Sequence, residues 1–319
     1  MPEESDETLA RLIAEVCEAV SARGREYWWL KQEVARGFEE RGYHLLPRHF
    51  YSPVPDPDTV ARHQWAAESF PLSKLRFDEA GTMRLCRTLV DHAREIEPLP
   101  SAADQAKGGY HWDNVFFTGL DAVALHGLVR ELKPSRIVEI GAGYSTHLSV
   151  QATKANGCGR VTCIEPYPSP ALLELRSDIE LLETTVQQAP RDVFQSLGHN
   201  DILFIDSSHV SALGSDVNLE LLELLPAIGE GALVHVHDIF FPYDYPQLFV
   251  DERRWYWNEQ YMLYAFLLFN PAFEVIFPVQ YLLTQRWEQV AGMAEPFAHP
   301  LRSGTSFWMR RRASSASLS

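Results

Sequence analysis

The spacing of apolar positions differs between the N-terminal region and the rest of the chain. Between residues 6 and 40, apolar side chains recur at intervals of three or four, and Gly42 follows. This spacing predicts one or two amphipathic helices that end before the glycine. The apolar side of the first helix consists of Leu9, Leu12, Ile13, Val16, Cys17 and Val20. Further along, Asp58 and Asp78 are placed to begin two more helices, which should end near residues 68 and 96.

From Thr118 onward, short apolar runs alternate with segments of helical spacing. The sequence "TGLD" at 118–121 resembles a capping box, so a helix should run from there to Pro134. The apolar runs predict strands at 136–141, 160–165, 179–184, 201–206 and 232–239. Strands that alternate with helices in this way predict the α/β class, with a Rossmann-like doubly wound sheet that is mostly parallel. A helix near 256–269 and two strand candidates, "FEVIFPVQ" and "SFWMRRR", complete this part.

A segment that contains proline and glycine, "EPLPSAADQAKGGY", separates the two patterns. We therefore predict a helical N-terminal region at 1–105, an α/β domain at 106–312 and a disordered tail at 313–319, because "ASSASLS" has little apolar surface to bury. The helices of the N-terminal region have an apolar side that needs a partner. This region is expected to cover the carboxyl edge of the sheet as a cap or to form the interface of a homodimer.

The overall composition is that of a globular protein, but the charge is not balanced. Of the 319 residues, 46% are hydrophobic, and the formal net charge is −15. Such a charge repels phosphate backbones and anionic membrane surfaces, so we expect a small-molecule partner and neither nucleic acid nor membrane binding. The N-terminus is acidic, and no apolar run approaches the ~20 residues that span a bilayer, which predicts a cytoplasmic protein. The four cysteines show no paired metal spacing and are expected to remain thiols.

A glycine-containing turn follows the first strand of the α/β domain. Gly141 would permit the sharp turn, and Gly143 would let a ligand approach the backbone. Ser145 or Thr146 could cap the next helix, whose N-terminus would face an anionic group. A carboxylate such as Glu165, at the end of the second strand, commonly accepts hydrogen bonds from the hydroxyls of a ribose. Because Thr146 stands where a dinucleotide fingerprint needs its third glycine, NAD is disfavoured.

The run from Glu139 to Gly143 resembles the first motif of class I S-adenosylmethionine-dependent methyltransferases. "DILFIDSSH" and "GEGALVHVHDI" resemble the fourth- and fifth-strand segments of that family, in the branch that reads Asp-Gly-x-His and then His-Asp. Ser207 stands here in place of the usual glycine. The resemblance covers roughly residues 110–312 and implies an antiparallel last strand and S-adenosylmethionine as cofactor. The implied cofactor-binding residues are Glu139, Gly141, Gly143, Ser145, Thr146, Glu165 and Asp206.

Polar residues at the ends of the fourth and fifth strands indicate where the chemistry would occur. Methyl transfer requires an aligned nucleophile and a group that takes up its proton. The candidate catalytic residues are His209, His237 and Asp238. Two interpretations remain open: His209 or His237 as a metal-free general base, or a divalent metal ion held by Asp206, His209, His237 and Asp238. The region also resembles metal-dependent small-molecule O-methyltransferases, and a histidine at 237 would suit a softer ion than Mg²⁺. His235, two residues before His237 in the same strand, is expected to be a hydrogen-bonded core histidine.

The resemblance implies methyl transfer to a hydroxyl of a small metabolite or glycan precursor. Several aromatic residues, including Phe116, Trp255 and Trp257, could line an acceptor pocket, and the candidate substrate residues are Tyr110, Asn114 and Tyr245. Because a fold does not fix a function, two alternatives stay open. The first is non-methylating chemistry on the same fold, such as that of a cyclase or a metal-dependent enzyme, and the second is a non-catalytic binding subunit.

Overall fold

The computed structural model describes residues 2–26, 29–96, 110–294 and 301–313. The chain divides into two compact units, Met1–His63 and Gln64–Ser319. The division falls well before the boundary predicted at residue 105. The reason is that the helix at 79–93 packs against the first helix of the α/β domain, where the Cα of Leu89 lies close to Gly127. The predicted tail falls mostly on residues 314–319, which lie outside the described residues.

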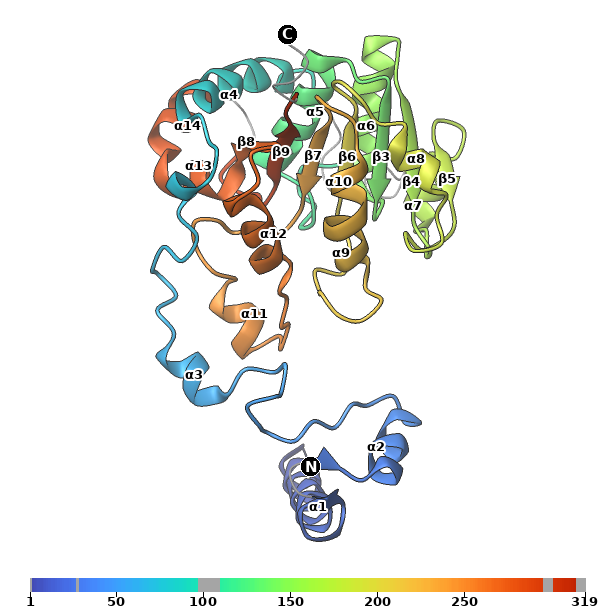
Figure 1. Cartoon of the computed structure of the whole chain (residues 1–319), viewed down its shortest axis with the longest axis vertical. Helices are drawn as coiled ribbons and strands as arrows, with labels where there is room; N and C mark the ends of the chain where they lie inside the picture. Colours follow the sequence, from blue (N-terminus) through green and yellow to red (C-terminus); the bar gives the residue numbers. More distant parts are fainter. Residues whose placement is uncertain (1, 27–28, 97–109, 295–300, 314–319) are drawn as a thin grey trace. The chain divides into compact units, whose positions relative to one another are not determined.

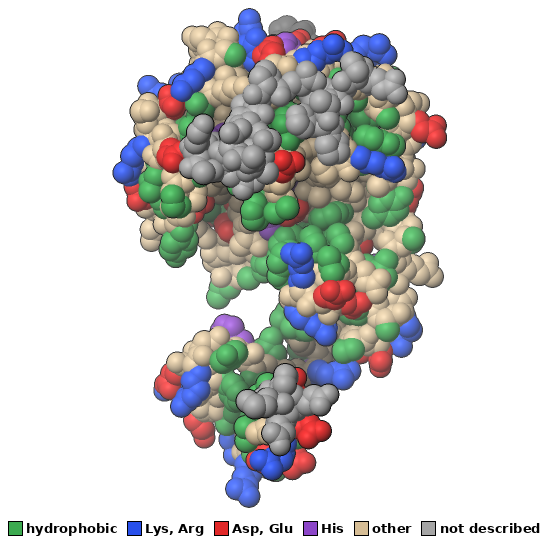
Figure 2. Space-filling view, turned by 180° about the vertical axis from the view of Figure 1, so that it is seen from behind, with side chains coloured by type: hydrophobic (Ala, Val, Ile, Leu, Met, Phe, Trp, Pro, Cys, Tyr) green, Lys and Arg blue, Asp and Glu red, His purple; other side chains and the backbone are tan. Residues whose placement is uncertain are grey.

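The N-terminal unit contains three helices and a short hairpin among its described residues. They are α1 (Pro2–Arg23), β1 (Arg25–Glu26), β2 (Trp29–Leu30), α2 (Gln32–Glu39) and α3 (Pro57–Arg62). The helices predicted between 6 and 40 are thus two, separated by the antiparallel pair β1–β2. The prediction at Asp58 is wrong in detail, because Asp56 caps α3 by accepting a hydrogen bond from the Asp58 N–H, and Pro57 takes the first helical position. Figure 2 shows hydrophobic side chains at the surface of this unit.

The second unit consists of strands that alternate with helices (Figure 1). Its strands are β3 (Arg136–Ile140), β4 (Arg160–Ile164), β5 (Glu180–Leu182), β6 (Ile202–Ile205), β7 (Leu233–Val236), β8 (Phe273–Pro278) and β9 (Phe307–Arg311). Its helices up to β6 are the 3-10 turn η1 (Leu72–Lys74), α4 (Glu79–Ala93), α5 (Leu120–Leu132), α6 (Tyr144–Asn156), α7 (Pro170–Glu174) and α8 (Arg191–Gln195). The later helices are α9 (Asp216–Leu219), the π-helical segment η3 (Glu220–Leu224), α10 (Leu225–Ala227), α11 (Gln247–Asp251), α12 (Glu259–Leu268), α13 (Val279–Gln285) and α14 (Trp287–Ala294).

In the described residues these strands form one seven-stranded sheet in the order β5-β4-β3-β6-β7-β9-β8. The five strands from β5 to β7 are parallel, and β9 inserts antiparallel between β7 and β8. The predicted Rossmann-like sheet with an antiparallel last strand is therefore confirmed. The order reverses between β3 and β6, which places the ends of these two strands at the topological switch point where ligands bind in such sheets.

Apolar side chains alternate between the two faces of the sheet, as the period of two in a strand requires. Along β6, Ile202 and Phe204 pack into a core covered by α4, α5, α6, α13 and α14, whereas Leu203 and Ile205 pack into a core covered by α8, α9–α10 and α12. Both faces are thus buried, which leaves the carboxyl edge as the place where polar side chains of the strand ends can gather.

The capping box predicted at 118–121 is wrong. Helix α5 begins at Leu120 after Gly119, whose φ is +62°. The Thr118 hydroxyl donates a hydrogen bond to the Trp112 carbonyl at 2.7 Å. The Asp121 carboxylate instead accepts hydrogen bonds from the backbone N–H groups of Thr305 (2.9 Å) and Ser306 (2.8 Å). This carboxylate therefore joins the start of α5 to the segment before β9.

Candidate active site at the carboxyl edge of the sheet

The turn after β3 has the two glycine properties that its sequence predicts. Gly141 has φ +78°, and a Cβ there would lie 1.9 Å from the Asp206 carbonyl oxygen, so no larger residue fits. At Gly143, by contrast, a Cβ would meet no atom within 4 Å. Helix α6 begins at the next residue, and the Gly143 N–H donates to the Thr146 hydroxyl at 3.1 Å. The backbone at Gly143 is therefore open to a ligand.

Glu139 lies inside β3 and is fully buried beneath this turn. Its carboxylate accepts hydrogen bonds from Thr146 (2.7 Å), Ser149 (2.5 Å) and Ser145 (3.3 Å). Burial raises the pKa of Glu139, and the three hydroxyls oppose this rise by stabilising the charged form. Glu139, Ser145 and Thr146, which the sequence predicts to bind the cofactor, are buried and bonded to one another in this structure. They support the turn and do not face the space above it.

Glu165 occupies a different position, directly after β4 and partly exposed. Its carboxylate accepts hydrogen bonds from the Tyr167 N–H at 2.8 Å and the Ala142 N–H at 3.3 Å. The second bond ties the end of β4 to the glycine turn after β3. Glu165 therefore lies beside the open backbone of Gly143, where a ligand's hydroxyls could reach it.

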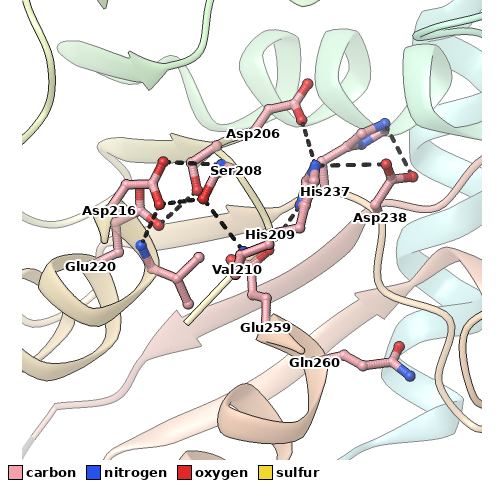
Figure 3. Close-up of polar contacts among 12 residues, drawn as sticks. Asp206, Ser208, His209, Val210, Asp216, Glu220, His237, Asp238, Glu259 and Gln260 are labelled. Carbon is pink, nitrogen blue, oxygen red and sulfur yellow. Dashed lines mark hydrogen bonds and ion pairs between the residues drawn. The ribbon is translucent and has the colours of Figure 1, made fainter. Parts of the chain in front are cut away.

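The structure brings together the four residues that the sequence places at the ends of the fourth and fifth strands (Figure 3). The His209 Nε2 lies 3.6 Å from Asp206 Oδ1 and 3.7 Å from Asp238 Oδ2, and the His237 Nε2 lies 3.9 Å from Asp238 Oδ1. His209 and Asp238 have φ values of +60° and +53°. Non-glycine residues in this left-handed region carry backbone strain that is common at functional sites.

Glu259, at the start of α12, contacts the ring nitrogen of His209 that does not face Asp206 and Asp238 (Figure 3). The His209 Nδ1 lies 2.9 Å from Glu259 Oε2, and both side chains are buried. Burial alone would lower the pKa of His209, but the Glu259 hydrogen bond and the charges of Glu259, Asp206 and Asp238 outweigh it and raise this pKa to about 9. At neutral pH, His209 is therefore an imidazolium among carboxylates. Sequence reasoning missed Glu259 because it lies in an otherwise apolar helix.

Two serines fix the turn that carries His209. The Ser207 hydroxyl donates to Glu220 at 2.9 Å, and the Ser208 hydroxyl donates to Asp216 at 2.5 Å. Glu220 is fully buried in the π-helical segment η3, and burial raises its pKa well above the ordinary value. A π-helical segment of this kind is frequent near functional sites. The serine that replaces the resembled family's glycine at 207 thus gives a buried carboxyl group a hydrogen-bond partner.

His237 lies near the partly exposed carboxylate of Asp238, and the buried carboxylate of Asp121 also acts on its charge. Burial lowers the pKa of His237, but the charges of Asp206, Asp238 and Asp121 together raise it above the ordinary value. Asp238 is held in turn by the Thr305 hydroxyl, which donates to it at 2.8 Å. Sequence reasoning missed Asp121 because "TGLD" predicts a helix cap there, and it missed Thr305 because this residue lies in a loop.

His235, by contrast, is fully buried and stacks on Phe204 with ring centroids 3.8 Å apart. Its Nε2 lies 2.8 Å from the Ser306 hydroxyl. The prediction of a hydrogen-bonded core histidine is confirmed for His235. His237, directly after β7, differs from it because it lines a cavity beside the strand ends. Only His237 reaches the space beyond the strand.

A cavity of about 500 Å³ opens beside these strand ends. Its polar wall includes Asp206, His237, Asp238 and Asp121, and its apolar wall includes Phe116, Phe249, Trp255 and Trp257. The two indole rings stack with centroids 4.9 Å apart, and Trp257 also packs against the His209 ring. A cavity with an aromatic wall and a few polar groups at one end is typical of a small-molecule site.

The three candidate substrate residues are not among those that line this cavity, and their role in acceptor binding stays a prediction. Tyr110 is buried in the core against Trp112. The Asn114 side chain is buried and bonds the backbone of its own loop, including the Phe117 N–H at 2.7 Å. The buried Tyr245 hydroxyl accepts a hydrogen bond from the Gln260 N–H at 3.1 Å. Each side chain is occupied by packing or by internal hydrogen bonds.

No group of three histidine, cysteine or acidic side chains in the described part of the chain is arranged to hold a metal ion. The predicted set of Asp206, His209, His237 and Asp238 is not among such groups in this structure, and a divalent metal ion at these residues stays a prediction. Within the same described residues, no helix is both long and apolar enough to cross a membrane.

Comparison with known proteins agrees with the sheet and the glycine turn. Residues 138–239 match a family model described as a methyltransferase domain. An uncharacterized protein from Archaeoglobus fulgidus is 28% identical over 178 residues, which are 51% of this chain and 78% of that protein. The segment from β3 to the end of β7, which carries the glycine turn and the strand-end histidines, is therefore similar to a methyltransferase domain.

Solved structures similar to this chain include two methyltransferases. The Podospora anserina methyltransferase PaMTH1, solved with SAH bound, is 18% identical with a TM-score of 0.40, over 75% of this chain and 98% of that one. The O-methyltransferase TomG from Streptomyces achromogenes, which is involved in tomaymycin synthesis and was solved with SAM, is 15% identical with a TM-score of 0.36. That similarity covers 76% of this chain and 94% of TomG.

Proposed function

We propose that this protein transfers a methyl group from S-adenosylmethionine to a hydroxyl of a small metabolite or glycan precursor. The observation that carries the proposal is the cavity beside the topological switch point. Aromatic side chains line one side of this cavity, and Asp206, His237 and Asp238 line the other. The glycine turn, whose backbone is accessible at Gly143, lies at the same edge of the sheet. A donor on the turn and an acceptor in the cavity would meet at the end of β6.

The residues of the donor side fit S-adenosylmethionine. Open space above Gly143 would admit the ligand to the backbone, and Glu165 would accept hydrogen bonds from the ribose hydroxyls. Asp206 lies between this turn and the cavity, where its carboxylate would face the donor's positive charge. When bound, the donor supplies an electrophilic methyl group on a sulfonium.

The acceptor hydroxyl must lose a proton as the new oxygen–carbon bond forms and the sulfur–carbon bond breaks. Because its pKa is raised to about 9, His209 is protonated at neutral pH and does not suit a base there. We assign the proton acceptor to Asp238, which lines the cavity and which Thr305 holds in place. The His209 imidazolium and the neighbouring His237 would position Asp238 and stabilise the negative charge that develops on the acceptor oxygen. No step requires a metal ion.

The donor assignment can be tested with two matched glycine variants. Isothermal calorimetry should show that the parent protein binds S-adenosylmethionine and S-adenosylhomocysteine. Gly143→Val should abolish this binding with little change in thermal stability, because its side chain enters space that only a ligand would occupy. The control is Gly198→Val, which also enters open space but lies before β6 at the other edge of the sheet. Its binding should equal that of the parent.

Calorimetry that detects no binding to the folded parent protein would overturn the proposal. Release of S-adenosylhomocysteine in the presence of a panel of hydroxylated small molecules then tests catalysis. Donor binding without release for any acceptor would favour the alternative of a non-catalytic subunit, and consumption of the donor without a methylated product would favour non-methylating chemistry.

A further inference from the structure

Almost all the described side chains of helix α1 are exposed. It spans 22 residues, Pro2–Arg23. In its described part, Val20 is half-buried and every other side chain is exposed, including Ile13 at 54% and Val16 at 47%. Isolated helices are marginal in water, and most helix stability in proteins comes from packing of an apolar face. The apolar side of α1 therefore requires a partner.

This apolar side forms one wall of a groove of about 600 Å³ within the N-terminal unit. The wall from α1 consists of Leu12, Ile13, Val16, Cys17 and Val20. The facing residues are Leu30, Phe38, Leu45, Leu46 and Pro47. Hydrophobic side chains are correspondingly visible on the surface of this unit (Figure 2). A contiguous exposed apolar surface of this kind marks an interaction site.

The apolar and charged positions of α1 match those of a second, antiparallel copy of the same helix. Intervals of four and three separate Leu9, Ile13, Val16 and Val20, which are successive core positions of a heptad pattern. The next core positions in the two directions are Asp6 and Arg23. In an antiparallel pair of two copies, Ile13 would face Val16, Leu9 would face Val20 and Asp6 would face Arg23. A parallel pair would instead place Asp6 opposite Asp6 and Arg23 opposite Arg23, and like charges repel.

We propose that α1 pairs antiparallel with α1 of a second copy of this chain, so that the protein is a homodimer. The pair has an apolar centre formed by Ile13, Val16, Leu9 and Val20, and an Asp6–Arg23 ion pair at each end. Two charges at the ends of the seam fix its direction, as polar core residues do in coiled coils. This inference does not depend on the proposed enzymatic function.

The experiment is analytical ultracentrifugation of the full chain across a micromolar concentration series. The parent protein should sediment as a dimer. Ile13→Asp places a charge in the apolar centre and should raise the dissociation constant by about a hundredfold or more. Ala14→Asp introduces the same charge on the neighbouring residue, which points away from the apolar side, and should leave the dimer intact. Val16→Asp serves as a second disruptive variant in case Ile13→Asp aggregates.

The direction of the pair is tested by exchanging its end charges. Asp6→Arg and Arg23→Asp should each weaken the dimer by about tenfold, because each creates like-charge contacts at both ends. The double variant should recover the parent affinity. A monomeric parent, a dimer that Ile13→Asp and Val16→Asp leave unchanged, or a double variant that binds no more tightly than the single ones would each overturn the proposal.

Discussion

The glycine turn after β3 and the histidine–carboxylate cluster after β6 and β7 lie at the same edge of the sheet but are constructed differently. The Glu139 carboxylate beneath the turn and the three hydroxyls that donate to it lie between Glu139 and Ser149, within one strand–turn–helix unit. The cluster combines side chains from the start of α5, the ends of two strands, the start of α12 and the loop before β9. The backbone conformation of Gly141 determines the shape of the turn. In the cluster, attraction between buried charged groups determines how the side chains are arranged.

The largest effect should come from the turn. Gly141→Ala would combine a left-handed backbone with a Cβ 1.9 Å from the Asp206 carbonyl, and it should destabilise the fold by about 3 kcal/mol or more. Chemical denaturation measures this loss. Gly143→Ala is the matched control, because its Cβ meets no neighbouring atom. Equal stabilities of the two variants would show that the backbone conformation of the turn is not as rigid as we infer.

In the cluster, the largest effect is expected on catalysis. Asp238→Asn keeps the shape of the side chain but removes its ability to take up a proton, so kcat should fall by about 10²- to 10⁴-fold with little change in donor affinity. The rate of S-adenosylhomocysteine release measures this change. Asp251→Asn removes a carboxylate of α11 that does not line the cavity, and it should be neutral. If Asp238→Asn retained the parent kcat, the proton acceptor would have to be a different group.

The buried charge of the cluster should make stability depend on pH. The folded pKa of His209, about 9, lies above its ordinary value of 6.5. Its stabilising contribution is therefore fully present below pH 6.5 and is lost as the pH rises through about 9. Because one pKa unit corresponds to about 1.4 kcal/mol, this contribution is about 3 kcal/mol.

Denaturation at several pH values between 6 and 10 tests this prediction on the parent and on His209→Gln. The parent should lose stability relative to the variant across the alkaline part of the range. Glu259→Gln should show the same loss of pH dependence, because it removes the partner that raises the His209 pKa. A stability difference between parent and His209→Gln that stays constant up to pH 10 would contradict the assigned imidazolium.

The same contrast explains how much of the molecule could be predicted from its sequence. Apolar runs predicted the parallel strands, and strand ends at one edge predicted that Asp206, His209, His237 and Asp238 would meet. The partners of these residues could not be predicted, because their contacts join segments far apart in the chain. Asp121 and Thr305, for example, are 184 residues apart.

The same limit applies to the aromatic and polar candidates. Composition does not distinguish a tyrosine that lines a cavity from one whose hydroxyl is bonded in the core, as Tyr245 is. In the same way, the sequence motif assigns Glu139 to a ligand, whereas in the structure its carboxylate accepts hydrogen bonds from three nearby hydroxyls. Local motifs predict which residue types are present, whereas burial decides which of them remain accessible.

The smallest effect should separate buried from exposed hydrogen bonds within the cluster itself. Ser207→Ala would leave the buried carboxyl group of Glu220 without its partner, which should cost about 1–3 kcal/mol of stability. Ser208→Ala would remove a bond to Asp216 at the surface, where water can replace the hydroxyl, and should cost about 0.5 kcal/mol or less. The two variants differ by one position and remove the same atom. If denaturation gave them equal stabilities, the burial of Glu220 would not make the Ser207 hydrogen bond more important for stability than the exposed hydrogen bond of Ser208.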